Sequence, residues 1–114
     1  MSQRVQRLGY LGQVTLAMAI TLGFAPVAYA ARGVVTHRIA SCDYFVVQAP
    51  NGYAVLEWYG GSEPDKGDII VGDFEAYGMK DVFNLTSDTT LTVWVDDFYL
   101  SSRSALEKLV EQCQ

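Results

Sequence analysis

The first thirty residues constrain this chain most, because they have the three-part organisation of a secretory signal peptide. The first seven residues carry two arginines and no acid, and an apolar stretch follows over residues 11–24. Pro26 ends that stretch, and Ala28 and Ala30 place small side chains at the −3 and −1 positions of a cut after Ala30. We therefore predict that residues 1–30 are removed during export to the periplasm or the exterior, which leaves 84 residues to fold.

A permanent membrane anchor is the alternative interpretation of the same segment. No charge occurs between Arg7 and Arg32, a gap of 24 residues, and this length is sufficient to span a bilayer. Gln13, Thr15 and Thr21 dilute the apolar stretch, however, and a proline falls near its end. These features favour a cleaved signal, and they predict a mature protein with no stable membrane span.

Removal of the signal changes the charge of the chain. The whole sequence has a formal net charge of −5, but residues 31–114 keep 6 cations against all 13 acids, a net charge of −7. Half of the residues are hydrophobic and only 18% are charged, which excludes a disordered chain. The length predicts that residues 31–114 form a single small domain. Its cations are scattered and its negative charge repels phosphates, so nucleic-acid binding is not expected.

Residues 31–114 are predicted to be mainly β. Pro50-Asn51-Gly52 separates two β-rich segments, and Asn-Gly in such a place is a strong hairpin signal because both residues tolerate a positive φ. Gly72 falls inside a later segment, as glycines do at bulges and barrel corners. The expected strands cover residues 34–40, 43–49, 53–59, 69–76, 81–86 and 89–96.

The end of the chain changes to a helical period. Ser104 and Glu107 have capping-box spacing, which predicts that a helix begins there. The apolar face that this helix is expected to bury consists of Leu106, Leu109, Val110 and Cys113.

Short strands in so small a domain cannot leave long sheet edges exposed. The sequence therefore predicts a small five- to six-stranded antiparallel barrel, SH3-like or OB-like, with one C-terminal α-helix packed across an opening. An open antiparallel sheet with the helix on one face is the alternative. In an oxidising compartment the two cysteines, Cys42 and Cys113, are expected to form a disulfide that ties the helix to the sheet.

Few residues that carry catalytic chemistry are present. His37 is the only histidine, and although Ser41 and Asp43 are near it in the sequence, nothing indicates an activated nucleophile. One histidine and two distant cysteines do not form a transition-metal site, and the acids do not match a calcium-binding loop. The sequence therefore predicts no catalytic residue, no metal and no cofactor.

Asp73 and Glu75 supply the one alternative with catalytic chemistry. They alternate onto one face of the predicted strand 69–76 and could stand side by side, as the paired carboxylates of glycosidases do. A domain of this length offers little room for a deep substrate cleft, so solvated surface acids are the expected explanation. A minimal carboxylate-dependent hydrolase is the alternative function.

Recognition is the function that the remaining features favour. On the predicted strand 53–59, Leu56 and Trp58 are expected in the core, which turns the tyrosines of that strand outward. Outward aromatic side chains can stack on a sugar or a peptide, although cross-strand pairing alone would also explain them. We therefore predict a small exported non-catalytic binding or accessory domain that recognises an envelope protein, peptide or polysaccharide. The candidate binding residues are Tyr44, Tyr53, Tyr59 and Trp94.

One triplet, Asn84-Leu85-Thr86, fits the acceptor pattern for N-glycosylation. The brevity of the signal and its Ala-x-Ala site are typical of bacteria, most of which do not use this acceptor. We therefore expect Asn84 to be unmodified.

Overall fold

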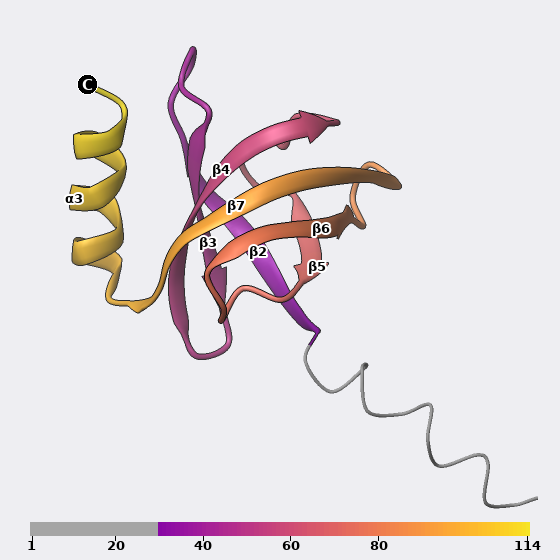
Figure 1. The fold of residues 1–114 in the computed structure, drawn as a ribbon, viewed down its shortest axis with the longest axis horizontal. Helices are drawn as coiled ribbons and strands as arrows, with labels where there is room; N and C mark the ends of the chain where they lie inside the picture. Colours follow the sequence, from indigo (N-terminus) through magenta and orange to yellow (C-terminus); the bar gives the residue numbers. More distant parts are fainter. Residues whose placement is uncertain (1–29) are drawn as a thin grey trace, which may run out of the picture.

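The computed structural model describes residues 30–114, and residues 1–29 of the predicted signal peptide lie outside the described residues. Six antiparallel strands close into a barrel, and one helix lies outside it (Figure 1). The prediction of a small barrel with a C-terminal helix is confirmed, and the architecture is compatible with SH3-like or OB-like character. The elements are β2 (Ala31–Arg38), β3 (Tyr44–Ala49), β4 (Gly52–Gly61), β5 (Ile69–Gly72), β6 (Gly78–Asn84), β7 (Thr89–Leu100) and α3 (Ser102–Gln112).

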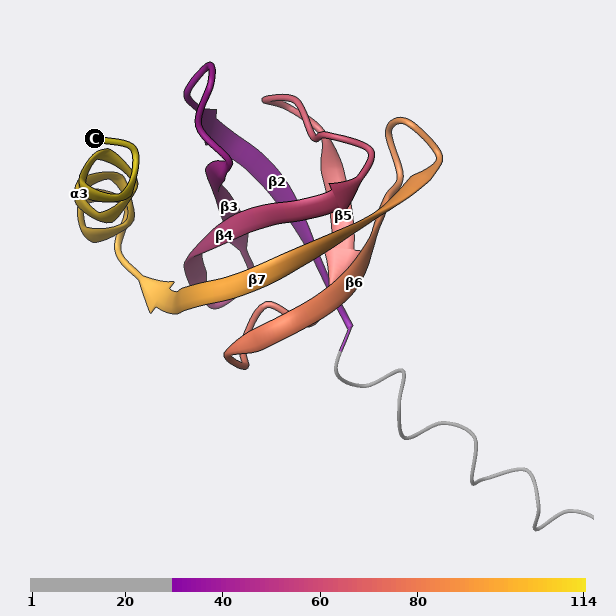
Figure 2. The same cartoon turned by 45° about the horizontal axis from the view of Figure 1, so that its top comes forward.

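The strand order around the barrel is β2-β3-β4-β7-β6-β5, and pairing of β5 with β2 closes the ring. Strand β7 runs between β4 and β6 and then leads directly into α3 (Figure 2). It extends to Leu100, four residues beyond the predicted end, because the ladder with β4 continues through irregularities in register. The acidic pair Asp96-Asp97 interrupts the hydrophobic alternation, so the sequence pattern did not predict this extension.

The predicted hairpin joins β3 to β4, but its turn lies one residue earlier than Asn51-Gly52. Ala49 pairs with Gly52, so Pro50 and Asn51 form the two-residue loop. Among the turn residues Pro50, Asn51 and Gly52, only Gly52 has a positive φ, at 137°. Because the proline ring fixes φ near −65°, Pro50 is suited to the first central position of a turn with negative φ.

Strand β5 is shorter than predicted. It ends at Gly72, where an added Cβ would lie 2.4 Å from the Cγ1 of Val82 on β6, so only glycine allows the close approach. Residues 73–77 then form a loop rather than a strand. Phe74 turns inward from this loop and is only 1% exposed. The expected alternation of Asp73 and Glu75 along a strand is therefore wrong.

Inward-facing side chains fill the barrel. Phe74 and residues from all six strands form the main core, and Trp58 lies partly buried against it. Strand alternation on β4 places Leu56 and Trp58 on the inner face, as predicted. The buried members of the main core are Val35, Phe45, Val47, Ala54, Leu56, Ile70, Phe74, Val82, Leu91, Val93 and Val95.

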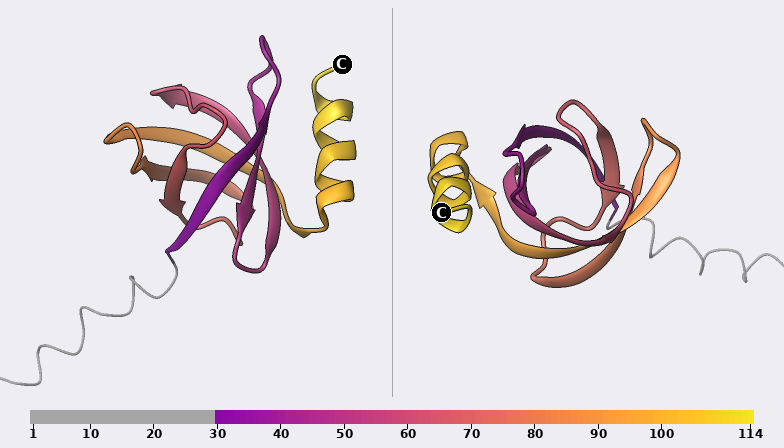
Figure 3. Two further views of the ribbon diagram at one scale, coloured as in Figure 1. Left: turned by 180° about the vertical axis from the view of Figure 1, so that it is seen from behind. Right: turned by 90° about the horizontal axis from the view of Figure 1, so that it is seen from above.

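Helix α3 lies against the outer face of β3 and β4 and does not cross a barrel opening (Figure 3). Val46 and Val55 are paired in the β3–β4 ladder, point away from the barrel interior and are fully buried by Ala105 and Leu109 of the helix. The physical reason for this position is that two apolar outward side chains require cover. This contact forms a second, smaller core.

The helix begins earlier and faces differently than predicted. Ser101 is the N-cap, and its hydroxyl accepts a hydrogen bond from the Ser104 backbone N–H, so the Ser104–Glu107 capping box is wrong. Leu106 and Val110 are 38% and 49% exposed, in contrast to the predicted burial. The buried stripe runs through Ala105 and Leu109 instead.

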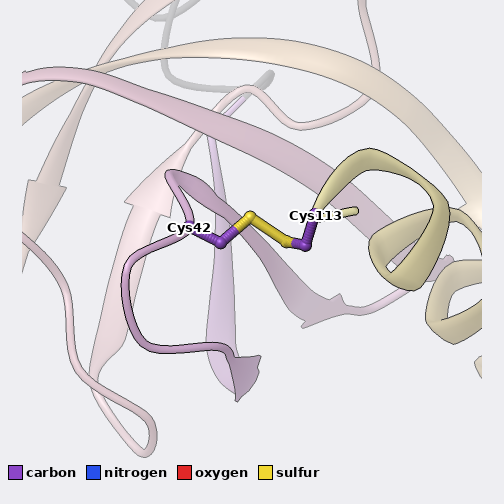
Figure 4. Close-up of a disulfide and its surroundings, with 2 residues drawn as sticks. All are labelled: Cys42 and Cys113. Atoms are coloured by element: carbon purple, nitrogen blue, oxygen red, sulfur yellow. A yellow bond between two sulfur atoms is a disulfide. The ribbon is translucent and has the colours of Figure 1, made fainter.

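The predicted disulfide is present. Cys42, in the turn between β2 and β3, bonds to Cys113, which follows α3, and their Cα atoms are 5.6 Å apart (Figure 4). The bond fixes the C-terminal end of the helix to the barrel across 71 residues of sequence. In the part of the chain that the structure describes, no helix has the length and hydropathy needed to cross a bilayer.

Candidate functional site

The structure divides the four candidate binding residues into two pairs. Tyr59 and Trp94 are 54% and 40% exposed, so both present their rings to solvent. Tyr44 and Tyr53 are partly buried against the small core beneath α3. The expected row of outward tyrosines is thus interrupted, because the helix covers the part of the sheet on which Tyr44 and Tyr53 lie.

Tyr44 is held by its neighbours rather than free for a ligand. It pairs with Glu57 in the β3–β4 ladder. Burial, the interaction of its hydroxyl with the Glu57 carboxylate and the negative charges of Glu57 and Asp96 raise the pKa of Tyr44 to about 12. The ring therefore acts as part of the packing between helix and barrel.

Trp94 is at the centre of an exposed cluster on the outer face of β4, β7 and β6. In register it lies between Glu57 on β4 and Met79 on β6, and Met79 is 50% exposed. Tyr59 is the next residue after Glu57 on the same side of β4. We call Tyr59, Met79 and Trp94 the outer patch. Met79 could not be predicted from the sequence, because only the β6–β7 register places it beside Trp94.

Acidic side chains border the outer patch. Glu57 is adjacent to Trp94 across the β4–β7 ladder, and Asp81 follows Met79 on the outer side of β6. The hydroxyl of Thr92 donates to Asp81 at 2.8 Å. Asp96 is the next outward residue on β7, and it pairs with Lys108 of α3 at 3.7 Å. The surroundings of the patch are therefore negative on three strands, with one lysine at its edge.

A second feature is a cleft at the end of the barrel where β2 begins. It has a volume of about 580 Å³ and contains both carboxylates of the alternative catalytic hypothesis. Although Asp73 and Glu75 do not lie on a strand, the β5–β6 loop brings them to the same cavity. We call this cavity the end cleft, and its lining residues are Ala30, Ala31, Pro50, Asn51, Asp73, Glu75, Ala76 and Tyr99.

Hydrogen bonds fix the carboxylates of the end cleft. Glu75 accepts from the Asn51 side-chain amide at 2.8 Å and from the Tyr99 hydroxyl at 3.1 Å. Asp73 accepts from the backbone N–H of Glu75 at 3.1 Å and lies 3.8 Å from the ammonium of Lys80. The hydrogen bond to Glu75, together with burial and nearby negative charge, raises the pKa of Tyr99.

Tyr99 adopts an unusual backbone conformation, with a φ of 59°. The left-handed region is unfavourable for a bulky side chain, so the surrounding contacts must hold this residue in place. Its ring contacts Phe98 edge-on at 4.9 Å, and Phe98 contacts Tyr77 at 4.7 Å. In this conformation the hydroxyl of Tyr99 donates its hydrogen bond to Glu75.

His37 is not part of the end cleft. Its Nδ1 lies 3.0 Å from the hydroxyl of Thr36, and the ring is half-buried in β2. Ser41 lies in the turn after this strand with a φ of 67°. Among residues 30–114, no group of three or more His, Cys, Asp or Glu side chains has an arrangement that could hold a metal ion.

Asn84, the candidate glycosylation acceptor, is fully buried. Its amide nitrogen donates to Asp68 at 2.8 Å, and its carbonyl oxygen accepts from the backbone N–H of Ser87 at 3.1 Å. The hydroxyl of Thr86 accepts from the backbone N–H of Ile69 at 2.9 Å. Both polar residues of the acceptor triplet therefore join β5 to the end of β6.

Comparisons of this chain with protein-family models, with curated proteins and with solved structures find no match to any of them.

Proposed function

We propose that residues 1–30 direct export and are removed after Ala30, and that the remaining domain works in an oxidising compartment outside the cytoplasm. The three-part organisation of this segment supports the proposal. The Cys42–Cys113 disulfide is consistent with it, because such bonds persist where thiols are not kept reduced.

The domain acts in this proposal as a binding module for a basic polypeptide segment. The observation that carries it is the position of Trp94, exposed between Met79 and Glu57 on the outer face of the sheet. An aromatic face attracts ammonium and guanidinium groups, and a methionine beside it adapts to apolar side chains. The acids around the outer patch add attraction for lysine and arginine.

Charge also selects among the three classes of partner considered for this domain. With a net charge of −7 over residues 31–114, the domain repels anionic polysaccharides. A peptide or protein segment that combines basic and apolar residues fits both the outer patch and its acidic border. This partner is therefore preferred over an envelope polysaccharide.

Tryptophan fluorescence tests the proposal directly. The chain has two tryptophans, and a Trp58→Phe variant makes Trp94 the only reporter. This change removes no hydrogen bond, because the Trp58 indole nitrogen is buried without a partner among the described residues. We expect a lysine-rich peptide with apolar residues to change the emission of Trp94, and a peptide with glutamate in place of lysine to leave it unchanged.

Variants then locate the binding surface. Tyr59→Ala and Met79→Ala should each weaken binding about 5-fold, which corresponds to about 1 kcal/mol per side chain. Leu85→Ala is the matched control, because Leu85 is similarly exposed at 41% but lies outside the outer patch. Equal responses to the basic and acidic peptides, or equal losses in Leu85→Ala, would contradict the proposal.

A second candidate function is the carboxylate-dependent hydrolase, favoured by the presence of Asp73 and Glu75 in one cleft. It predicts that the purified protein releases new reducing ends from an envelope polysaccharide. Asp73→Asn and Glu75→Gln should each abolish the release while leaving the fold intact. No release above a heat-denatured control would reject this function.

A further inference from the structure

We propose that the end cleft is a binding site for an α-ammonium group, and that its occupant is the amino terminus of this chain after cleavage between Ala30 and Ala31. The inference rests on the proposed removal of residues 1–30. The ligand is the α-ammonium group of Ala31, which exists only after cleavage.

The position of Ala31 carries the proposal. Ala31 is the first residue of β2 and lies opposite Gly72, the last residue of β5, so it is next in space to the start of the loop that holds Asp73. The side chain of Ala31 packs against the main core, which fixes the residue at the rim of the cleft. Ala31 therefore lines the same cavity as both carboxylates.

The cleft has the chemistry that an ammonium group requires. Glu75 accepts hydrogen bonds from Asn51 and Tyr99, which orient its two oxygens, yet no ion pair to Glu75 exists within residues 30–114. Asp73 has Lys80 as a partner at 3.8 Å, a distance that leaves room for a closer cation. Carboxylates and a free amine that line one cavity attract one another even near a protein surface.

Cleavage creates the group that fits. A peptidase adds water across the Ala30–Ala31 amide, so the C–N bond breaks, the carbonyl carbon gains oxygen as a carboxylate, and the nitrogen leaves as an ammonium at neutral pH. Before this step the nitrogen of Ala31 is a neutral amide with one N–H. Afterwards it carries a positive charge and three N–H donors, beside two acids that the structure has already positioned.

The charged surroundings of the amine determine the sign of its pKa shift. Asp73 and Glu75 on the β5–β6 loop raise the pKa of the α-amino group, whereas Lys80 on β6 and the neighbouring Arg32 lower it. Tyr99 on β7 donates to Glu75 and is neutral near pH 7, as any tyrosine with an ordinary or raised pKa is. Because the two acids lie in the cleft itself, we expect the pKa of the α-amino group to be raised.

A chain that begins at Ala31 tests the site whatever the fate of the natural signal. All buried members of both cores lie within residues 31–114, so such a chain keeps every core side chain. We expect an NMR titration of its α-amino group to give a pKa about 0.5 unit above the ordinary 7.7–8.0. At pH 7 the amine should then react with an acylating reagent about 3-fold more slowly than an exposed amine.

Isosteric variants show whether the cleft causes the shift. Asp73→Asn and Glu75→Gln keep the shape of these side chains but remove their negative charge, so together they should return the α-amino pKa to the ordinary range. Glu107→Gln, on the exposed side of α3, is the matched control and should change nothing. An ordinary pKa in the unchanged chain, or an equal shift in the Glu107→Gln control, would overturn the ammonium site.

The intact mass of the full-length product, expressed with export, separates this inference from the proposal on which it rests. A mass that retains residues 1–30 refutes processing, even when the chain that begins at Ala31 shows a raised pKa. A mass that begins at Ala31, combined with an ordinary pKa, overturns the ammonium site and leaves processing intact. A mass that begins at Ala31 with a raised pKa supports both.

Discussion

The phenol of Tyr44 is held in its protonated form by burial and by the carboxylate of Glu57. A tyrosine whose pKa rises from 10.0 to about 12 on folding binds its proton more tightly in the folded state than in the unfolded state. Its contribution to stability is therefore complete below pH 10 and is lost as the pH rises to about 12. The pKa of Tyr99, which donates to Glu75, is also raised on folding.

A Tyr44→Phe variant should reveal this linkage. We expect its free energy of unfolding to be lower than that of the wild type at pH 9, and the difference to shrink between pH 10 and pH 12, because only the wild-type phenol loses a proton. Urea unfolding monitored by circular dichroism at each pH measures the difference. A difference that stays constant over this range would contradict the role assigned to the phenol.

At the same scale, the sequence predicted exposure better for some side chains than for others. Tyr59 points outward as expected from strand alternation, and both Tyr59 and Trp94 are exposed. Tyr44 and Tyr53 also point outward, but whether an outward residue is covered depends on where the helix lies. The alternation of side chains along a strand does not predict where the helix lies.

Helix α3 depends on long-range contacts for its place in the structure. Its buried stripe contains only Ala105 and Leu109, so the apolar area that holds it against Val46 and Val55 is small. The Cys42–Cys113 bond joins the end of the helix to the turn before β3, at a sequence separation of 71. Together these contacts replace the larger hydrophobic face that the spacing of Leu106 and Val110 suggested.

Loss of the disulfide should therefore destabilise the whole domain. A Cys42→Ser/Cys113→Ser double variant is expected to lose about 4 kcal/mol of unfolding free energy, the chain-entropy value for a loop of this length. Chemical denaturation measures the loss, and the wild type under reducing conditions serves as the matched comparison. A loss below about 1 kcal/mol would contradict the chain-entropy value for this loop.

The elements themselves were predictable to different degrees for physical reasons. The β3–β4 hairpin follows from local turn chemistry, although Pro50 moves the turn by one residue. The early end of β5 could not be predicted, because it depends on the approach of Gly72 to Val82 across the barrel. The start of α3 differs because Ser101, rather than Ser104, meets the free N–H groups of the first turn.

At the scale of the whole molecule, closure of the sheet brings together residues that no sequence pattern relates. The end cleft combines the start of β2, the β3–β4 turn, the β5–β6 loop and the end of β7. Asp73 and Glu75 were predictable as a pair, but Tyr99 and Asn51 were not, since they come from distant parts of the chain. The barrel was predictable because short strands must hide their edges.

The net charge of −7 over residues 31–114 predicts how the proposed peptide binding responds to salt. We expect the Kd of the lysine-rich peptide to rise several-fold between 0.05 M and 0.5 M NaCl, because the Debye length shortens from about 14 Å to about 4 Å. Fluorescence titration of the Trp58→Phe variant measures this dependence. A Kd that does not change with salt would mean that the acids around the outer patch take no part in binding.

The burial of Asn84 limits where this protein can be produced. A glycan attached to its amide nitrogen would displace the hydrogen bond to Asp68 and hold open the junction between β5 and β6. A cell that glycosylates nascent chains would thus divert the modified molecules from the folded state, and the folded fraction would contain only unmodified chains. The triplet 84–86 is therefore expected to impair folding only in a cell that glycosylates Asn84.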